Sequence, residues 1–170
     1  RRQRQMCIRD RCKQEDADMV FRNLERAEDL SRDAMLEGID WRWETFPEFL
    51  DVIDELPKGI NYAGYIGHSA LRTYVMGERA FSDAAGEDDV RSMQGLVKQA
   101  VQAGAIGFST SRTFNHLTAD DRPVASRIAE WNEVRAIVNA VGETGKGLFE
   151  IAGEAPGRDP ERIAEYHGRL

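Results

Sequence analysis

Three short apolar segments, separated by amphipathic helical patterns, constrain the fold more than any other feature of this sequence. They cover residues 61–66, 105–109 and 147–151, and Gly104 and Gly107 bracket the second one. We expect this second segment to open into a hydroxyl-rich turn at Ser109, Thr110 and Ser111. A short apolar run can also belong to a buried helix, but flanking glycines favour a strand. Because a helical segment lies between neighbouring strands, none of them can pair through a hairpin. This alternation predicts an α/β fold with a parallel sheet and right-handed crossovers.

Amphipathic helices are predicted before, between and after these strands. Apolar residues recur at helical spacing in 15–30, 49–56, 90–101 and 128–141. The Thr-x-x-Glu pattern at residues 45–48 is typical of a capping box at a helix start. Shorter helices are expected at 34–37 and 71–76, and a last one begins at Pro160. The helices that precede residue 61 form a helical insertion at the N-terminal end of the sheet.

Length and composition narrow the class of protein. A closed (β/α)8 barrel needs ~250 residues, so 170 residues supply a partial TIM barrel of three to four βα units; a doubly wound sheet is the alternative. No uncharged run reaches the ~18–20 apolar residues of a membrane span. The net charge of −7 disfavours nucleic acid as a partner. Cys7 and Cys12 are too few for a disulfide scaffold, so a cytoplasmic location is the default expectation.

The first eleven residues differ in character from the rest of the chain. Residues 1–5 are basic, and residues 6–11, Met-Cys-Ile-Arg-Asp-Arg, resemble the translation of a sequencing adapter. We therefore expect residues 1–11 to be a non-native tip and residues 12–170 to form the domain. A basic arm for nucleic-acid binding or targeting is the alternative.

Polar side chains follow the strands, where barrels and doubly wound sheets keep their ligands. Glu150 stands in an otherwise apolar strand, and a buried carboxylate needs a partner or a raised pKa, so it is a candidate acid/base or cation partner. The candidates for substrate binding are His68, Ser69, Ser109, Thr110, Ser111 and Arg112.

Each candidate also has a purely structural interpretation. Arg112 suits a carboxylate clamp, because its guanidinium is a planar fork, but a salt bridge to Asp120 or Asp121 is equally consistent. Ser109 and Thr110 either donate to a substrate carbonyl or cap the following loop. A histidine after a strand, such as His68, is often a hydrogen-bonded structural residue.

Three motifs stand in a fixed order along the chain. Residues 38–50 begin Gly-Ile-Asp-Trp-Arg-Trp-Glu, residues 67–72 read Gly-His-Ser-Ala-Leu-Arg, and residues 104–113 read Gly-Ala-Ile-Gly-Phe-Ser-Thr-Ser-Arg-Thr. In order and spacing they resemble the N-acyl-D-amino-acid deacylase (D-aminoacylase) branch of the amidohydrolase superfamily. The resemblance implies a (β/α)8 metal-dependent hydrolase with zinc as cofactor. Such an enzyme cleaves the amide (C–N, non-peptide) bond of an N-acylated amino acid or related amide by means of a metal-activated water.

The sequence also departs from the pattern of that branch. The His-x-His metal pair and the metal-binding cysteine of an Asn-Cys-Gly turn have no counterpart here, and Ala152 stands where the resemblance implies a ligating histidine. We therefore expect an interior segment of such an enzyme that binds no zinc and is inactive by itself. The alternatives are a catalytically silent amidohydrolase-like binding protein and an unrelated small α/β interaction domain.

Overall fold

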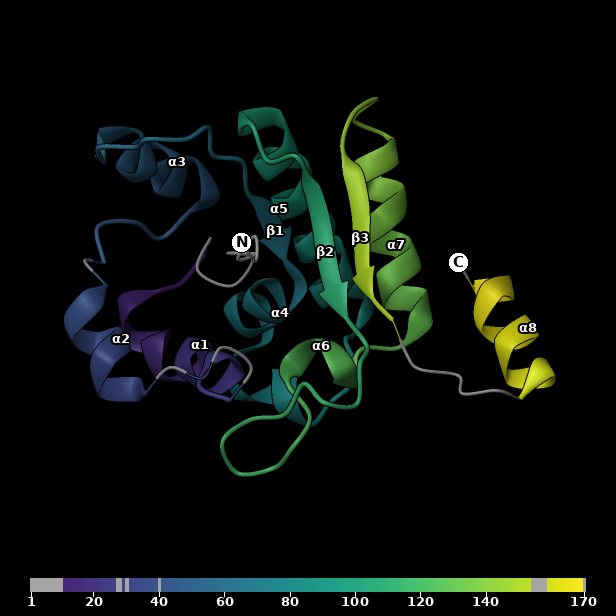
Figure 1. Ribbon diagram of the computed structural model, residues 1–170. Coiled ribbons are helices and arrows are strands. Elements are labelled where there is room, and N and C mark those ends of the chain that lie inside the picture. The colour runs from purple at the N-terminus through teal and green to yellow at the C-terminus, as the bar shows by residue number, and fades with distance from the viewer. Residues whose placement is uncertain (1–10, 27–28, 30, 40, 154–158, 170) are drawn as a thin grey trace.

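The computed structural model describes residues 11–26, 29, 31–39, 41–153 and 159–169. Figure 1 shows a short sheet with helices around it and a helical N-terminal part beside β1. In chain order the elements are η1 (Gln14–Asp16), α1 (Ala17–Leu24), α2 (Arg32–Gly38), α3 (Phe46–Glu55), β1 (Tyr65–Gly67), α4 (His68–Met76), η2 (Gly77–Phe81), α5 (Glu87–Ala103), β2 (Gly107–Ser111), α6 (Ala125–Ile128), α7 (Trp131–Gly142), β3 (Leu148–Ala152) and α8 (Pro160–Arg169).

The three strands form a parallel sheet in the order β1-β2-β3. Tyr65 pairs with Gly107 in β2, and Gly107 pairs in turn with Leu148 in β3. The predicted parallel sheet of neighbouring strands is therefore confirmed, with each strand displaced by one to a few residues toward the C-terminus.

The end of β2 differs from the expectation that Ser109, Thr110 and Ser111 form a turn. All three belong to the strand, because the ladder with β3 continues to the pair Ser111 and Ala152. The Arg112 amide then donates to the Ala152 carbonyl at 2.7 Å. Strand pairing therefore fixes the direction of these hydroxyl side chains more firmly than a turn would.

The first predicted helix is shorter than its apolar pattern. The pattern extends to residue 30, whereas α1 ends at Leu24. Asp29 has a φ of 53°, a left-handed conformation that an α-helix does not contain. Residues 27, 28 and 30 lie outside the described residues.

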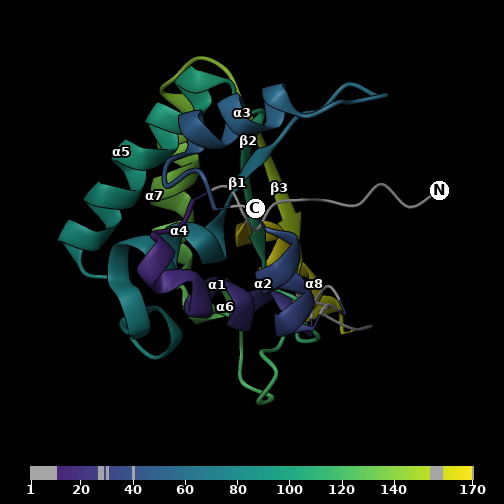
Figure 2. The same cartoon turned by 90° about the vertical axis from the view of Figure 1, so that its left-hand side faces the viewer.

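One face of the sheet packs against helices, and we call it the helix-covered face. Ile66 and Phe108 on this face share a buried cluster with Val97 and Val101 of α5 and Ile137 of α7. Figure 2 shows α5 and α7 on the same side of the strands. Because strand side chains alternate between faces, Ser109, Ser111 and Glu150 lie on the other face, which we call the opposite face.

The N-terminal helices have a core of their own. Phe21 of α1 and Met35 of α2 are each 2% exposed or less. Trp41 lies 5.8 Å from the Phe21 ring and 5.7 Å from Trp43, whose ring lies 5.5 Å from Phe49 of α3. The two tryptophans thus anchor this part to the main core.

The proposed boundary after residue 11 stays a prediction. Residues 1–10 lie outside the described residues. Arg11 is 1% exposed, and its guanidinium lies 5.0 Å from the centre of the Tyr74 ring.

Candidate active face at the strand ends

A buried polar network lies on the helix-covered face of the sheet, at the C-terminal ends of β1 and β2. His68 begins α4 immediately after β1, and it is 1% exposed. Its Nδ1 lies 2.7 Å from the Thr110 hydroxyl of β2, and its Nε2 lies 2.8 Å from Oε1 of Glu133 in α7. Arg72, one helical turn after His68, donates to Oε2 of the same carboxylate. Four side chains from three elements, α4, β2 and α7, are therefore joined by a single chain of hydrogen bonds.

The charges of this network follow from its burial. Burial lowers the pKa of His68, so the ring is neutral. Burial raises the pKa of Glu133, but the hydrogen bond from His68 and the charge of Arg72 outweigh this effect and hold the pKa of Glu133 below its usual value. An ionised Glu133 only accepts hydrogen bonds, so Nε2 of His68 carries the proton and Nδ1 accepts from Thr110. The guanidinium and the carboxylate neutralise each other.

Arg72 has further acceptors that keep it in place. Its Nη2 donates to the Asp83 carbonyl at 2.7 Å and to the Ala80 carbonyl at 3.3 Å. Its side chain is fully buried, and that of Glu133 is 4% exposed. A buried ion pair of this kind adds little net stability, but the loss of one partner leaves an uncompensated charge.

Ser69 and Ser111 take part in contacts that position α6. The Ser69 hydroxyl accepts from the Ser126 amide at 3.1 Å, and the Ser126 hydroxyl donates to the Ser111 carbonyl at 3.0 Å. The Ser111 hydroxyl itself is buried and has no hydrogen-bond partner among the described residues.

Arg112 is directed toward the backbone of α6 and the loop that follows. Its Nη1 donates to the carbonyls of Ser126, Arg127 and Ala129. Its guanidinium lies 5.3 Å from the centre of the Trp131 ring. The two aspartates that were its expected alternative partners have other partners, because Asp120 pairs with Arg122 and Asp121 with Arg26.

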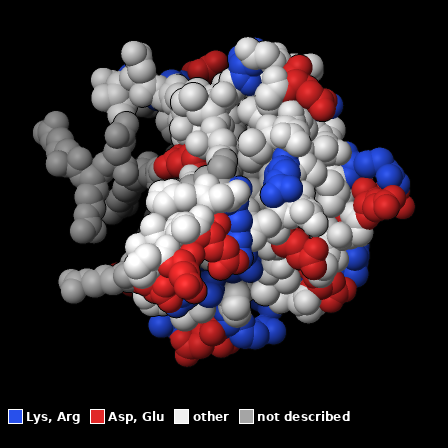
Figure 3. All heavy atoms as spheres, turned by 90° about the vertical axis from the view of Figure 1, so that its right-hand side faces the viewer, with Lys and Arg blue, Asp and Glu red and all other residues white. Residues whose placement is uncertain are grey.

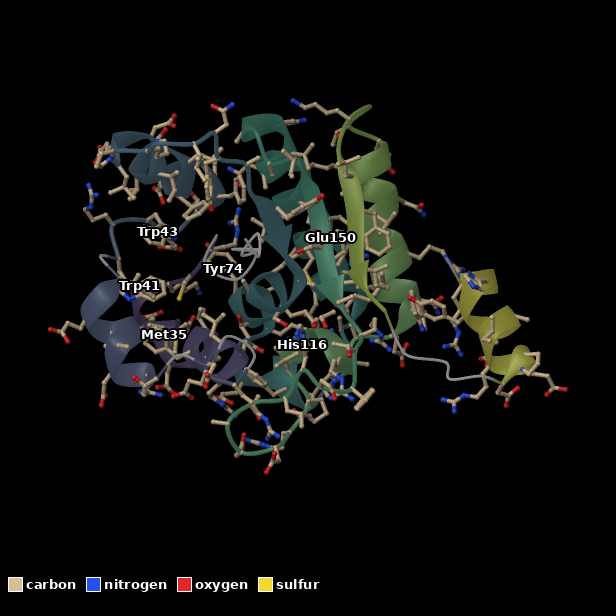
Figure 4. The ribbon with its side chains drawn as sticks, in the orientation of Figure 1. Met35, Trp41, Trp43, Tyr74, His116 and Glu150 are labelled. Atoms are coloured by element: carbon tan, nitrogen blue, oxygen red, sulfur yellow. The ribbon has the colours of Figure 1, made fainter. Side chains whose placement is uncertain are left out.

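Glu150 projects from the middle of β3 (Figure 4), and its register partner in β2 is Ser109. One carboxylate oxygen, Oε2, is buried without a hydrogen-bond partner among the described residues. Ser109 is 8% exposed. The structure therefore separates the candidates into three groups. Ser109, Ser111 and Glu150 lie on the opposite face. His68 and Thr110 belong to the buried network on the helix-covered face, and Ser69 and Arg112 contact α6.

Glu133 and Arg72 are central to the network, but neither is among the candidates that the sequence motifs indicate. A signal was present in both cases, because each is a charged residue inside an apolar helical stripe. Glu133 precedes Val134 in α7, and Arg72 follows Leu71 in α4. Opposite charges in two separate apolar stripes are consistent with a buried pair, but sequence alone does not show that the stripes meet.

The described residues do not fit the metal that the resemblance implies. No three His, Cys, Asp or Glu side chains among them converge on a point where an ion would bind. His68 has both ring nitrogens engaged by Thr110 and Glu133. Burial, followed by the nearby carboxylates, raises the pKa of the Cys12 thiol to about 12, so it is not a thiolate ligand. We assign no reaction step to a metal held by these side chains.

Comparison with known proteins gives the family. The chain matches no protein-family model. It is 32% identical over 143 residues to an uncharacterized protein of Mycobacterium tuberculosis, a match that covers 79% of this chain and 23% of that protein. It is 37% identical over 78 residues to D-aminoacylase of Alcaligenes xylosoxydans xylosoxydans, which covers 46% of this chain and 16% of the enzyme.

Solved structures agree with the sequence matches. A crystal structure of D-aminoacylase that defines a novel subset of amidohydrolases matches with a TM-score of 0.55 and 27% identity, over 75% of this chain and 24% of that one. A second one, from work on the binuclear metal center of D-aminoacylase, matches with a TM-score of 0.56 and 26% identity, over 86% and 28%. The chain belongs to the D-aminoacylase branch of the amidohydrolases. It spans 23% of the length of the first curated relatives that it matches.

Two further observations on this D-aminoacylase relative concern the length of its helices and the charge of its surface. No helix among the described residues is long and apolar enough to cross a membrane. On the face shown in Figure 3, acidic and basic side chains are interspersed among neutral ones.

Proposed function

We propose that this chain supplies part of the active face of a metal-dependent amidohydrolase, which cleaves the amide bond of an N-acylated amino acid or a related amide. The observation that carries the proposal is the similarity to D-aminoacylase, 37% identity over 78 residues. The arrangement of polar side chains at the ends of parallel strands supports it, because barrel enzymes place their substrates there.

The fold that accompanies this function is a (β/α)8 barrel of which β1, β2 and β3 are consecutive wall strands. Their parallel order and the helices on one face support this assignment. The helices before β1 form an insertion at the N-terminal end. In this arrangement the opposite face of the sheet points toward the barrel axis, and the network of His68 and Glu133 lies outside the wall.

The substrate-binding residues then have two kinds of role. Ser109 and Ser111 are on the opposite face and contact the substrate, together with Glu150. His68, Thr110, Ser69 and Arg112 hold β2, α4 and α6 in position through the bonds described above. Zinc, when bound, supplies an activated water for amide hydrolysis. Its ligands belong to parts of the enzyme other than the residues described.

The test is hydrolysis by the full-length protein that carries this sequence. Purified with zinc, it is expected to release free amino acid from members of a panel of N-acetyl-D-amino acids. Ser109→Ala is expected to lower turnover, whereas Ser82→Ala, in an exposed turn, serves as the matched control. No release across the panel would overturn the proposal. The 170-residue chain alone is expected to retain no zinc after dialysis and to show no turnover, because its described residues offer no convergent ligand set.

One observation favours a second candidate function, that of a binding protein with the barrel fold but without catalytic activity. Ala152 stands at the position of an implied metal-ligating histidine, and alanine cannot ligate zinc. Metal analysis of the full-length protein separates the two candidates: the binding protein contains no stoichiometric zinc and still binds N-acyl amino acids.

A further inference from the structure

Two polar atoms on the opposite face of the sheet are buried and have no hydrogen-bond partner in the described part of the chain. They are Oε2 of Glu150 in β3 and the hydroxyl oxygen of Ser111 in β2. Ser109 is the register partner of Glu150, and Ser111 follows two residues later on the same face. A carboxylate and two hydroxyls therefore share one small area of the sheet.

The contrast with Glu133 shows that Glu150 is not a structural ion-pair residue. Glu133 has one oxygen hydrogen-bonded to His68 and the other to Arg72. Glu150 has no ion pair or hydrogen bond with any residue that the structure describes. A buried polar atom that lacks a partner costs about 1–3 kcal/mol, and more when it is charged, so such atoms call for an explanation.

A bound cationic group explains these atoms. A carboxylate accepts hydrogen bonds through both oxygens, and a serine hydroxyl also accepts. A guanidinium or ammonium group donates several hydrogen bonds and cancels the charge. A metal ion is a poorer fit, because no set of three ligating side chains forms among the described residues. An acidic group would be repelled by Glu150.

We propose that Glu150, Ser109 and Ser111 form a subsite for a cationic group of the ligand. The inference rests on the proposed function. It narrows the substrate class to N-acylated amino acids that carry a basic side chain, or to amides with an equivalent amine or guanidine group. Glu150 is the residue that determines this specificity.

The experiment measures binding rather than hydrolysis, so it does not depend on a working metal site. Nα-acetyl-D-arginine, Nα-acetyl-D-citrulline and Nα-acetyl-D-glutamate are titrated into the purified full-length protein that carries this sequence, after its metal has been removed with a chelator, and the dissociation constants are measured by isothermal titration calorimetry. Citrulline has nearly the shape of arginine without its charge. The arginine derivative is expected to bind about tenfold more tightly than the citrulline derivative, which corresponds to one charge-assisted hydrogen bond. The glutamate derivative is expected to bind least.

Variants assign the preference to Glu150. Glu150→Gln is nearly isosteric and is expected to reduce the arginine-to-citrulline ratio to about one, by removal of the charge-assisted bond. Glu143→Gln is the matched control, because Glu143 is an exposed residue that pairs with Lys98 at the end of α7. It carries the same charge change and is expected to leave the ratio as in the wild type.

The outcomes are decisive in each direction. Equal affinity for the arginine and citrulline derivatives, preference for glutamate, or no binding by the wild-type chain overturns the subsite. An unchanged ratio in Glu150→Gln overturns the role of Glu150. If the variant does not fold, the wild-type ratio still decides whether the subsite selects a cation. If the full-length protein hydrolyses no amide while the charge preference stands, the proposed reaction fails and the cation subsite does not.

Discussion

Substitution of Glu133 by glutamine tests whether the buried network behaves as the structure implies. The change removes one negative charge and leaves the shape of the side chain almost intact. Arg72, whose side chain is fully buried, then loses its charged partner, and its acceptors are the neutral carbonyls of Ala80 and Asp83 and the amide oxygen of the glutamine. An uncompensated buried charge costs about 3–5 kcal/mol. Since small domains have only about 5–15 kcal/mol of stability, this single change removes a large share of it.

The assay is urea unfolding followed by tryptophan fluorescence, with Glu78→Gln as the control. Glu78 also pairs with an arginine, Arg22, but its side chain is 71% exposed. An exposed pair of this kind is worth about 0–1 kcal/mol, so the control is expected to unfold close to the wild type. The double variant Arg72→Met/Glu133→Leu removes both charges together and is expected to be more stable than Glu133→Gln. A loss below about 1 kcal/mol in Glu133→Gln, or a double variant less stable than the single one, would refute the uncompensated-charge argument.

Three further predictions address pH, strand contact and helix capping. Burial lowers the pKa of His68 below 6.5, so the unfolded chain binds more protons than the folded chain as the pH falls below 6.5. The free energy of unfolding is therefore expected to decline there by up to about 1.4 kcal/mol per pH unit. Urea titrations of His68→Gln at several pH values should show a shallower decline. A Cβ at Gly107 would lie 1.9 Å from the Leu148 carbonyl oxygen, so Gly107→Ala is expected to disrupt the β2–β3 pairing. Gly95→Ala is the control: it lies in open space on α5 and should raise the midpoint of thermal unfolding. A well-folded Gly107→Ala variant would contradict the strand contact. Thr45→Ala removes the side-chain cap of α3 and is expected to cost about 1 kcal/mol, measured by the same urea titration. Thr113→Ala is the control, because the Thr113 hydroxyl makes no hydrogen bond with a described residue, and it tests whether loss of a threonine alone has this effect.

The strand order was predictable because the sequence pattern reflects burial directly. Residues 105–108 are apolar and lie between two amphipathic segments, and only a covered parallel strand satisfies both patterns. The capping box at Thr45 and Glu48 was also predictable, since its hydrogen bonds join residues three apart. Both inferences depend on local spacing, which a sequence shows.

The active face was only partly predictable. The sequence places Ser109, Ser111 and Glu150 near strand ends, and the register of β2 with β3 then brings Ser109 and Glu150 side by side. The turn expected at residues 109–111 was wrong, because the neighbouring strand that extends β2 lies far away in sequence. Alternation along an extended strand separates Thr110 from Ser109 and Ser111, a separation that a turn would not have imposed.

By itself the sequence determined the alternation of helices and strands, the family motifs and the polar character of the strand ends, because these depend on neighbours along the chain. The tertiary structure alone decided that His68 of α4, Thr110 of β2 and Glu133 of α7 form one network, and that Glu150 has no such partner within the described part of the chain. The physical reason is that pairing of buried charges depends on contacts between residues as far apart as 61 positions, as for Arg72 and Glu133. No local pattern specifies such contacts; the packing of the helices against the sheet does.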